Sequence, residues 1–234
     1  MLTTIGSRRG RAAVLALAAL LLTACSPTTL VATPSATATP SATPTATPTA
    51  TPVEEPAVSA IVIGGSEFTT VDTAGAVVDT VPFSSDPAAV IALLSELFDA
   101  EPLVSAVPQE HCSPSFNRAD WEGAVKLDTD FAWLPEGQLF EIYATAPSIA
   151  GIAITTSGGL AVGDDASALI ASLPPAQVQL YEYEGVTQGT AAYEVEAGEF
   201  GPDSFDAWGA EVLVRGSLVD GIVSPAIFLA ATTC

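Results

Sequence analysis

The sequence predicts an α+β fold built mainly from antiparallel sheet, with one short helix in each half of a domain spanning residues 57–234. Three observations lead to this prediction. Many segments of the domain alternate apolar and polar residues with a period of two, the pattern of strands with one buried face. Two segments repeat apolar residues at helical spacing. Strands and helices do not alternate regularly, which argues against a parallel sheet of βαβ units.

The first helix is expected after the segment Ser84-Ser85-Asp86-Pro87, which offers a capping side chain and then proline at the first helical position. Glu101-Pro102 ends it. Its apolar residues follow the i, i+3, i+4, i+7, i+8 spacing of a buried stripe: Val90, Leu93, Leu94, Leu97 and Phe98.

The second helix is expected between Asp164-Asp165, which serve as its cap, and Pro174-Pro175, which stop it. Its buried stripe comprises Ala166, Leu169, Ile170 and Leu173. Strands are expected around the two helices, at 59–64, 67–72, 76–81, 104–107, 123–128, 138–145, 151–156, 177–184, 191–196, 211–215 and 218–230, the last with a break near Pro225.

The domain is also expected to be a tandem duplication of a ββα-plus-strands unit, with repeats at about 57–145 and 146–234. An offset of about 86 residues places Phe68-Thr69-Thr70-Val71 on Ile154-Thr155-Thr156-Ser157. Each segment precedes a turn with glycine, a short apolar strand (76–78 and 160–162) and a helix. An offset of about 87 places 121–127 on 208–214, with a tryptophan first in each.

Residues 1–24 have the features of an export signal. Three arginines precede an uncharged apolar run of about 11 residues, which is shorter than the roughly 20 that span a bilayer. The run ends in Leu22-Thr23-Ala24-Cys25, which resembles the lipobox of bacterial lipoproteins. That resemblance implies a diacylglycerol group on the Cys25 thiol, cleavage before Cys25, and an added fatty acyl chain such as palmitate on the new amino group. The alternative is an ordinary secretory signal whose cleavage releases the protein.

Residues 25–56 contain almost only Thr, Pro, Ala and Ser beyond the cysteine. These residues have too little bulky apolar surface to offset the entropy that the chain would lose on ordering. We call this segment the stalk and expect it to stay unfolded. Its prolines favour an extended spacer of about 3.1 Å per residue, roughly 90 Å in all. The composition also fits an O-glycosylated stalk. Lipobox, stalk and Ala/Val/Asp/Glu-rich domain together resemble secreted lipoproteins of actinobacteria in layout, which implies a location on the outer face of the cell membrane, with the domain extending into or beyond the wall.

The domain is strongly acidic. It holds 25 acidic residues against three basic ones, Arg118, Lys126 and Arg215, a formal charge of −22. Such a surface repels phosphate backbones, so nucleic acid is excluded as a partner. Solubility explains an acidic surface, and attraction of divalent cations or basic partners is the functional alternative. Two cysteines remain after Cys25, and in an oxidising compartment Cys112 and Cys234 are expected to form one disulfide.

No catalytic residues, cofactor or metal site are predicted. His111 is the only histidine, and no nucleophile motif accompanies it. Asp72-Thr73-Ala74-Gly75 is interpreted as a hairpin turn, and Asp128-Thr129-Asp130 lacks most ligands of a calcium loop; non-standard calcium binding there or near Asp203 and Asp206 is the alternative. Three aromatic residues near Leu134-Pro135 are core residues or line a ligand surface: Phe131, Trp133 and Phe140.

The sequence therefore favours a membrane-tethered, non-enzymatic module that binds an envelope protein, a wall polymer or an ion. The alternative is an extracellular hydrolase that uses two carboxylates to cleave a wall or other polymer. A solute-binding receptor is a third hypothesis, which the short chain and the missing βαβ alternation disfavour.

Overall fold

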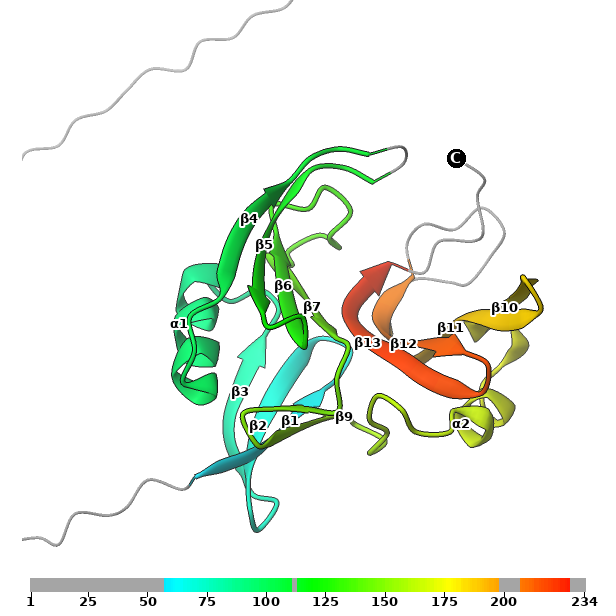
Figure 1. The fold of residues 1–234 in the computed structure, drawn as a ribbon, viewed down its shortest axis with the longest axis horizontal. Coiled ribbons are helices and arrows are strands. Elements are labelled where there is room, and N and C mark those ends of the chain that lie inside the picture. The colour runs from blue at the N-terminus through cyan, green and yellow to red at the C-terminus, as the bar shows by residue number, and fades with distance from the viewer. Residues whose placement is uncertain (1–56, 111–112, 198–206, 228–234) are drawn as a thin grey trace, which may run out of the picture. The chain divides into compact units, whose positions relative to one another are not determined.

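The computed structural model describes residues 57–110, 113–197 and 207–227. Thirteen strands, two α-helices and one short 3-10 helix (η1) occur in this part of the chain (Figure 1). In chain order they are β1 (Val58–Ile63), β2 (Glu67–Asp72), β3 (Val77–Pro82), α1 (Pro87–Phe98), β4 (Leu103–Val107), β5 (Phe116–Trp121), β6 (Val125–Thr129), β7 (Phe140–Ala144), β8 (Ser148–Ile149), β9 (Ile152–Thr156), α2 (Ser167–Ser172), η1 (Pro175–Gln177), β10 (Val178–Tyr183), β11 (Val186–Ala197), β12 (Trp208–Arg215) and β13 (Leu218–Ile227).

The strands form two sheets. The five-stranded sheet has the order β3-β2-β1-β9-β8, in which β1 pairs in parallel with β9 and every other pair is antiparallel. The parallel pair places Ala60 opposite Ala153, so this sheet joins the two halves of the domain. The predicted mainly antiparallel sheet is confirmed, in a structure that is mostly β and has two α-helices.

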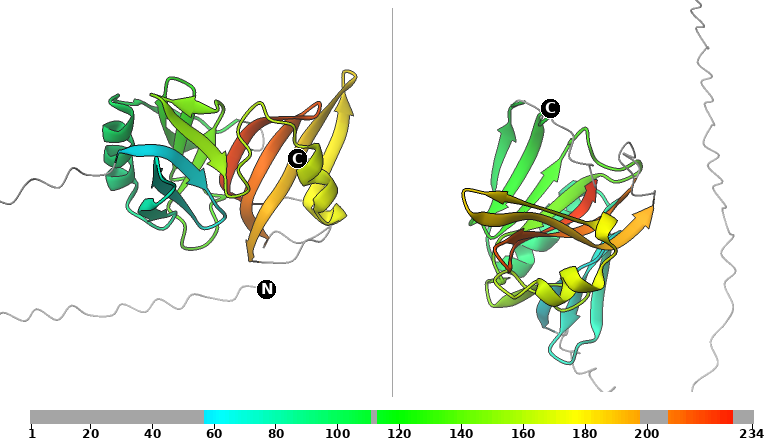
Figure 2. Two further views of the ribbon diagram at one scale, coloured as in Figure 1. Left: turned by 90° about the horizontal axis from the view of Figure 1, so that it is seen from below. Right: turned by 90° about the vertical axis from the view of Figure 1, so that its right-hand side faces the viewer.

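The eight-stranded sheet has the order β10-β11-β12-β13-β7-β6-β5-β4 and is antiparallel throughout. Each half consists of four consecutive strands, and the last strand of one half pairs with the last strand of the other, as Ile222 opposite Ala144 shows. Figure 2 shows the β10 to β13 half as adjacent ribbons coloured from yellow to red. The strand order is therefore symmetric about the β7–β13 pair.

Helix α1 begins and ends as its residue types predict. The Asp86 carboxylate accepts the N–H of Ala88 at 3.1 Å, and Pro87 is the first helical residue. The helix ends at Phe98, followed by Asp99 in a left-handed conformation with φ 49°. The predicted stripe faces the core: Val90, Leu94 and Phe98 are buried, and Leu93 and Leu97 pack against them.

One large apolar core lies beneath both sheets and the helices, and Trp121 is its largest fully buried side chain. The Trp121 indole N–H donates to the Ala100 carbonyl at 3.1 Å, and its ring meets Phe98 edge-on at 5.8 Å between centroids. Because Trp121 ends β5 and Phe98 ends α1, this contact fixes the helix on the sheet.

The turn after β1 is bound to the eight-stranded sheet by polar contacts. The Ser224 hydroxyl donates to the Gly64 carbonyl at 2.7 Å, and the Tyr193 hydroxyl donates to the Ile63 carbonyl at 2.7 Å. A Cβ at Gly65 would lie 2.4 Å from the Glu196 carboxylate, so a larger residue there would require the Glu196 side chain of β11 to move.

Several predicted boundaries were wrong. Strand β5 was not predicted, and β11 begins at Val186 rather than near 191. Residues 160–162 form no strand, because the chain turns there toward α2: the Asp164 carboxylate accepts the N–H of Ala161, and Gly163 donates to the Val219 carbonyl. Helix α2 has Ala166 at its cap position, while the predicted Asp165 accepts the N–H of Ser167 at 2.8 Å.

Candidate functional site

The eight-stranded sheet has one face on the large core, and its other face carries a second, smaller apolar cluster in which Ala192 and Val223 are buried. Residues directly opposite each other in an antiparallel pair share a face. Ala119, Leu127 and Ile142 lie opposite one another in β5, β6 and β7, and all three are buried in the core. Arg118, Asp128 and Glu141, each one residue away along its strand, therefore lie on the other face.

The same rule extends this second face across the whole sheet. Lys126 lies opposite Tyr143, Tyr143 opposite Val223, and Val223 opposite Glu211. Arg215 and Glu211 lie on the same face of β12, because an even number of positions separates them. Arg215 lies opposite Gln188 of β11, and Gln188 lies opposite Tyr181 of β10. We call this surface the outer face. It comprises Phe116, Arg118, Asp120, Lys126, Asp128, Glu141, Tyr143, Tyr181, Gln188, Glu211, Leu213, Arg215 and Val223.

Arg118 and Asp128 form a bidentate pair on the outer face. The guanidinium Nε lies 2.7 Å from one carboxylate oxygen and Nη2 lies 2.6 Å from the other. The hydrogen bonding of Arg118 to the Asp128 carboxylate raises the pKa of Arg118, so the guanidinium stays charged. Asp128 is only 5% exposed, so removing Arg118 would leave a buried charge without a partner. Among residues 57–110, 113–197 and 207–227 this is the one salt bridge.

Aromatic rings continue from this pair toward solvent. The Arg118 guanidinium carbon lies 5.0 Å from the centroid of the Phe116 ring, a cation–π distance. Phe116 meets Phe131 edge-on at 5.3 Å, and Phe131 contacts Trp133 at 5.7 Å between ring centroids. Trp133 is 38% exposed. Two of the three predicted aromatic residues thus reach the surface together, while Phe140 is fully buried against Phe83 at 5.4 Å and belongs to the core.

Two half-buried carboxyl groups lie near the middle of the outer face. The pKa of Glu141 is raised to about 8, chiefly by burial, with smaller contributions from the carboxylates of Asp128 and Glu211; Arg118 acts in the opposite direction. Burial also raises the pKa of Glu211 to about 7, against the lowering effect of a hydrogen bond with Thr190. Near pH 7 a large share of both groups therefore holds a proton.

Lys126 and Tyr143 form a second cation–π pair, with the ammonium nitrogen 5.3 Å from the ring centroid. Tyr143 reaches across β13, where a Cβ on Gly221 would lie 3.1 Å from the tyrosine ring. Glycine at this position therefore lets the ring lie against the backbone of the neighbouring strand. Burial raises the pKa of the Tyr143 hydroxyl, so the ring carries a neutral O–H at physiological pH.

A hollow of about 600 Å³ lies over β10 to β13. Its lining includes Tyr181, Gln188, Leu213 and Arg215 of the outer face, together with Asp220. Tyr181 is 60% exposed. Arg215 is exposed and has no ion-pair partner among the described residues, so its guanidinium is available to a ligand. This hollow lies in the second half of the sheet, whereas the aromatic row from Phe116 to Trp133 lies in the first half.

The candidate calcium residues are engaged otherwise. Asp128 binds Arg118, and the Asp130 carboxylate accepts the Asn117 amide N–H at 2.8 Å. Asp72 caps the turn after β2 by accepting the N–H groups of Ala74 and Ala76, which confirms the hairpin interpretation. Within the described part of the chain no group of three or more acidic, cysteine or histidine side chains is arranged to hold a metal ion.

The other residues singled out from the sequence lie outside the described residues: Cys25, His111, Cys112, Asp203, Asp206 and Cys234. Sequence reasoning also did not predict the outer face. The signal that could have found it is the alternation of charged with apolar residues in Arg118-Ala119-Asp120 and in Lys126-Leu127-Asp128, but its meaning depends on strand register.

Comparison with known protein families, with curated proteins and with solved structures finds no match to this chain. No helix in the described segments has the length and apolar character needed to cross a bilayer.

Proposed function

We propose that this chain is a membrane-anchored surface lipoprotein that binds a protein partner through the outer face of its eight-stranded sheet. One observation carries the proposal. The domain has only three basic residues, and all three lie on the outer face: Arg118, Lys126 and Arg215. A random distribution of so few cations over an acidic domain would scatter them, whereas here each lies near an aromatic ring or a hollow.

The residue types of the outer face fit protein recognition. Tyrosine, tryptophan and arginine are the side chains that most often dominate binding energy at protein interfaces. Tyr181 supplies a large exposed ring, and Arg215 supplies a guanidinium without an ion-pair partner in the described region; the exposed ring of Trp133 lies beside the face, in the segment between β6 and β7. These groups flank half-buried, partly protonated carboxyls, so the centre of the outer face is less negative than its residue types suggest.

The second candidate function is carboxylate-dependent hydrolysis of an extracellular polymer. The elevated pKa values of Glu141 and Glu211 favour it, since a general acid must hold a proton at the working pH. The lining of the hollow over β10 to β13 includes neither carboxyl group, which disfavours it. We therefore rank binding first.

A photo-reactive amino acid in place of Tyr181, in the full chain on living cells, is expected to cross-link to a discrete protein. The same amino acid in place of Val77, which is 60% exposed on β3 of the other sheet, is the matched control and is expected to give no adduct. Adding Arg215→Glu should lower the Tyr181 adduct by about tenfold or more, because interface arginines commonly contribute 2 kcal/mol or more. Equal adducts at both positions, or no adduct at Tyr181, would contradict the proposal.

Residues 1–56 determine the cellular location of the protein in this proposal. Lipid on Cys25 holds the chain on the outer face of the membrane, residues 26–56 act as the spacer, and a Cys112–Cys234 disulfide closes the domain. Two or three acyl chains give lasting attachment, since each buried methylene contributes about 0.8 kcal/mol. The basis for this part is the sequence alone.

Cys25→Ala is expected to release the protein into the medium or leave an uncut precursor, because the lipid attachment site is lost. Fractionation of cells into membrane and medium, with mass analysis of the N-terminus, measures this. Ser41→Ala in the stalk serves as the control, because it keeps the lipobox and both cysteines of the domain. A Cys25→Ala protein that still requires detergent for extraction from membranes contradicts lipidation.

We also infer that the domain arose by tandem duplication. The symmetric order of the eight-stranded sheet supports it, as do two corresponding threonines. Thr70 and Thr156 are both buried, and each hydroxyl accepts a hydrogen bond from a backbone N–H that follows the next turn. The donor to Thr70 is Asp79 at 3.1 Å, and the donor to Thr156 is Leu160 at 3.0 Å. In related sequences, an alignment of the first half of the domain with the second half is expected to keep this correspondence. An alignment no better than chance would contradict the duplication.

A further inference from the structure

The described sheets have four edge strands, and only one of them is unprotected. Natural proteins protect edges with charges, prolines, bulges or very short strands. Strand β3 carries Asp79, Pro82 and a bulge, β8 has two residues, and β10 carries Glu182. Strand β4 reads Leu-Val-Ser-Ala-Val, with no charge and no proline, and its pairing with β5 is regular over all five residues.

Strand β4 is also openly accessible. Leu103 is 74% exposed and Val104 is 66% exposed. Its pairing with β5 uses one edge of the strand, so half of its backbone N–H and C=O groups face away from the sheet. Such a row of free donors and acceptors is the template to which an extended peptide adds as another strand.

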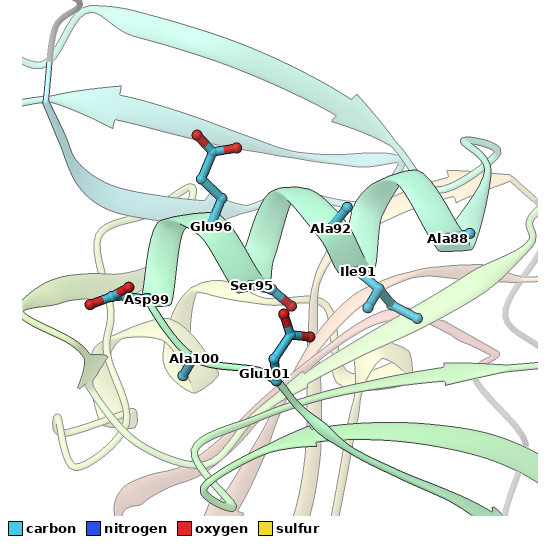
Figure 3. A pocket seen from close by; sticks show the side chains of 8 residues that line it. All are labelled: Ala88, Ile91, Ala92, Ser95, Glu96, Asp99, Ala100 and Glu101. Atoms are coloured by element: carbon cyan, nitrogen blue, oxygen red, sulfur yellow. The ribbon is translucent and has the colours of Figure 1, made fainter.

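A hollow of about 600 Å³ lies beside the start of β4, against α1 (Figure 3). Three acidic residues line it, Glu96, Asp99 and Glu101, whose carboxylates point in different directions in Figure 3, and its remaining lining is small or apolar: Ala88, Ile91, Ala92, Ser95 and Ala100. Figure 3 shows the Ser95 hydroxyl and the Glu101 carboxylate turned toward each other. The Ser95 oxygen is buried and has no hydrogen-bond partner among the residues that the structure describes.

The electrostatics of this hollow favour a cation. Helix α1 ends there at Phe98, so the negative end of its dipole adds to the three carboxylates. The last turn of α1 contains no basic residue, and the hollow has none in its lining. A lysine or arginine side chain placed there would meet opposite charge from the helix end and from the carboxylates together.

We propose that β4 accepts an extended, basic segment of a partner protein as a ninth strand, with a lysine or arginine of that segment in the hollow beside α1. Side chains of an added strand alternate between the two faces of the sheet. Those on the α1 side, where Phe98 packs on Trp121, project toward Glu96, Asp99 and Glu101. A second copy of this chain fits poorly, because each domain carries a formal charge of −22. This site is separate from the outer face and stands without it.

The test uses the full chain and a labelled peptide of about eight residues that alternates lysine with valine, at about 0.15 M ionic strength. Fluorescence anisotropy is expected to show saturable binding. An otherwise identical peptide with N-methyl groups on its central backbone nitrogens should bind at least about tenfold more weakly, because it cannot form the ladder. A peptide with glutamate in place of lysine should not bind. Equal binding of the N-methylated peptide, or no binding of the lysine peptide, overturns the proposal.

Matched variants separate strand addition from general attraction to an acidic protein. Val104→Lys places a charge on the β4 edge and should weaken binding by about tenfold or more, whereas Val77→Lys on β3 adds the same charge and should leave binding unchanged. The double variant Glu96→Gln/Glu101→Gln removes two carboxylates of the hollow and should weaken binding. The double variant Glu136→Gln/Glu184→Gln removes two exposed carboxylates elsewhere and should weaken binding less. Equal effects within either pair overturn the proposal.

Discussion

The full chain is expected to resist unfolding by denaturant more strongly at about pH 5.5 than at about pH 9. The reason is the pair of half-buried carboxyl groups on the outer face. The pKa of Glu141 is about 8 and that of Glu211 about 7 in the folded chain, against an ordinary value of 4.5. The urea midpoint, measured across this pH range, reports the effect.

The sign follows from proton binding. Between about pH 4.5 and pH 8 the folded chain holds protons on Glu141 and Glu211 that the unfolded chain has released, so stability falls as pH rises through this range. Each pKa unit corresponds to about 1.4 kcal/mol, so the two groups together cost on the order of several kcal/mol at high pH. Above about pH 8 both groups are ionised in both states and the dependence ends.

Glu141→Gln with Glu211→Gln is the control, because glutamine keeps the shape and does not ionise. The double variant is expected to have a flatter profile and a higher midpoint than the original chain at pH 9. Parallel profiles for the two proteins would show that these carboxyl groups do not govern the dependence.

Burial is the main cause of both raised pKa values, and the shortage of bases in the domain leaves little to oppose it at Glu141. Arg118 is committed to Asp128 by two hydrogen bonds, and Lys126 lies over Tyr143. Glu141 therefore has Asp128 and Glu211 as charged neighbours with only Arg118 opposing them. Near neutral pH the outer face is therefore less negative than a count of its acidic residues suggests. A lower charge reduces the cost of removing water from this face when a partner binds.

Local signals in the sequence were sufficient to predict an element where the residues of that segment alone determine its structure. Helix α1 has a cap, a proline and a long apolar stripe within one short segment, and its prediction was correct. Strand β5 has only a short alternation of charged and apolar residues, Arg118-Ala119-Asp120-Trp121, and the partner that neutralises Arg118 lies on β6. A strand whose charges are balanced across a sheet cannot be read from its own residues.

The candidate site depended even more on register. The sequence placed Phe131, Trp133 and Phe140 together as candidate ligand residues, but the burial of Phe140 depends on Phe83, which lies in a distant part of the chain. The outer face brings together seven strands from both halves, and a shift of one residue in any of them would move its charges into the core. Local periodicity predicts that such a face exists, and only the pairing shows which residues share it.

Trp121→Ala is expected to destabilise the domain by about 3 to 5 kcal/mol, the range for removing a buried aromatic side chain. Trp121 is 1% exposed, and the substitution removes both the edge-on contact with Phe98 and the hydrogen bond to Ala100. Helix α1 then loses its main attachment to β5. Trp121→Phe keeps most of the ring and loses the indole N–H, so about 1 to 2 kcal/mol is expected. Denaturant unfolding of the full chain measures both.

Trp208→Ala is the matched comparison, because Trp208 is the residue that the duplication offset aligns with Trp121. The two are not structural equivalents: Trp121 ends β5, whereas Trp208 begins β12 and is only partly buried. Trp208 has no ring contact or indole hydrogen bond within the described residues. Its removal should therefore cost less than half as much as removal of Trp121. Equal losses would mean that Trp208 packs as Trp121 does, and that the tryptophans, rather than the strand order, mark the correspondence between the halves.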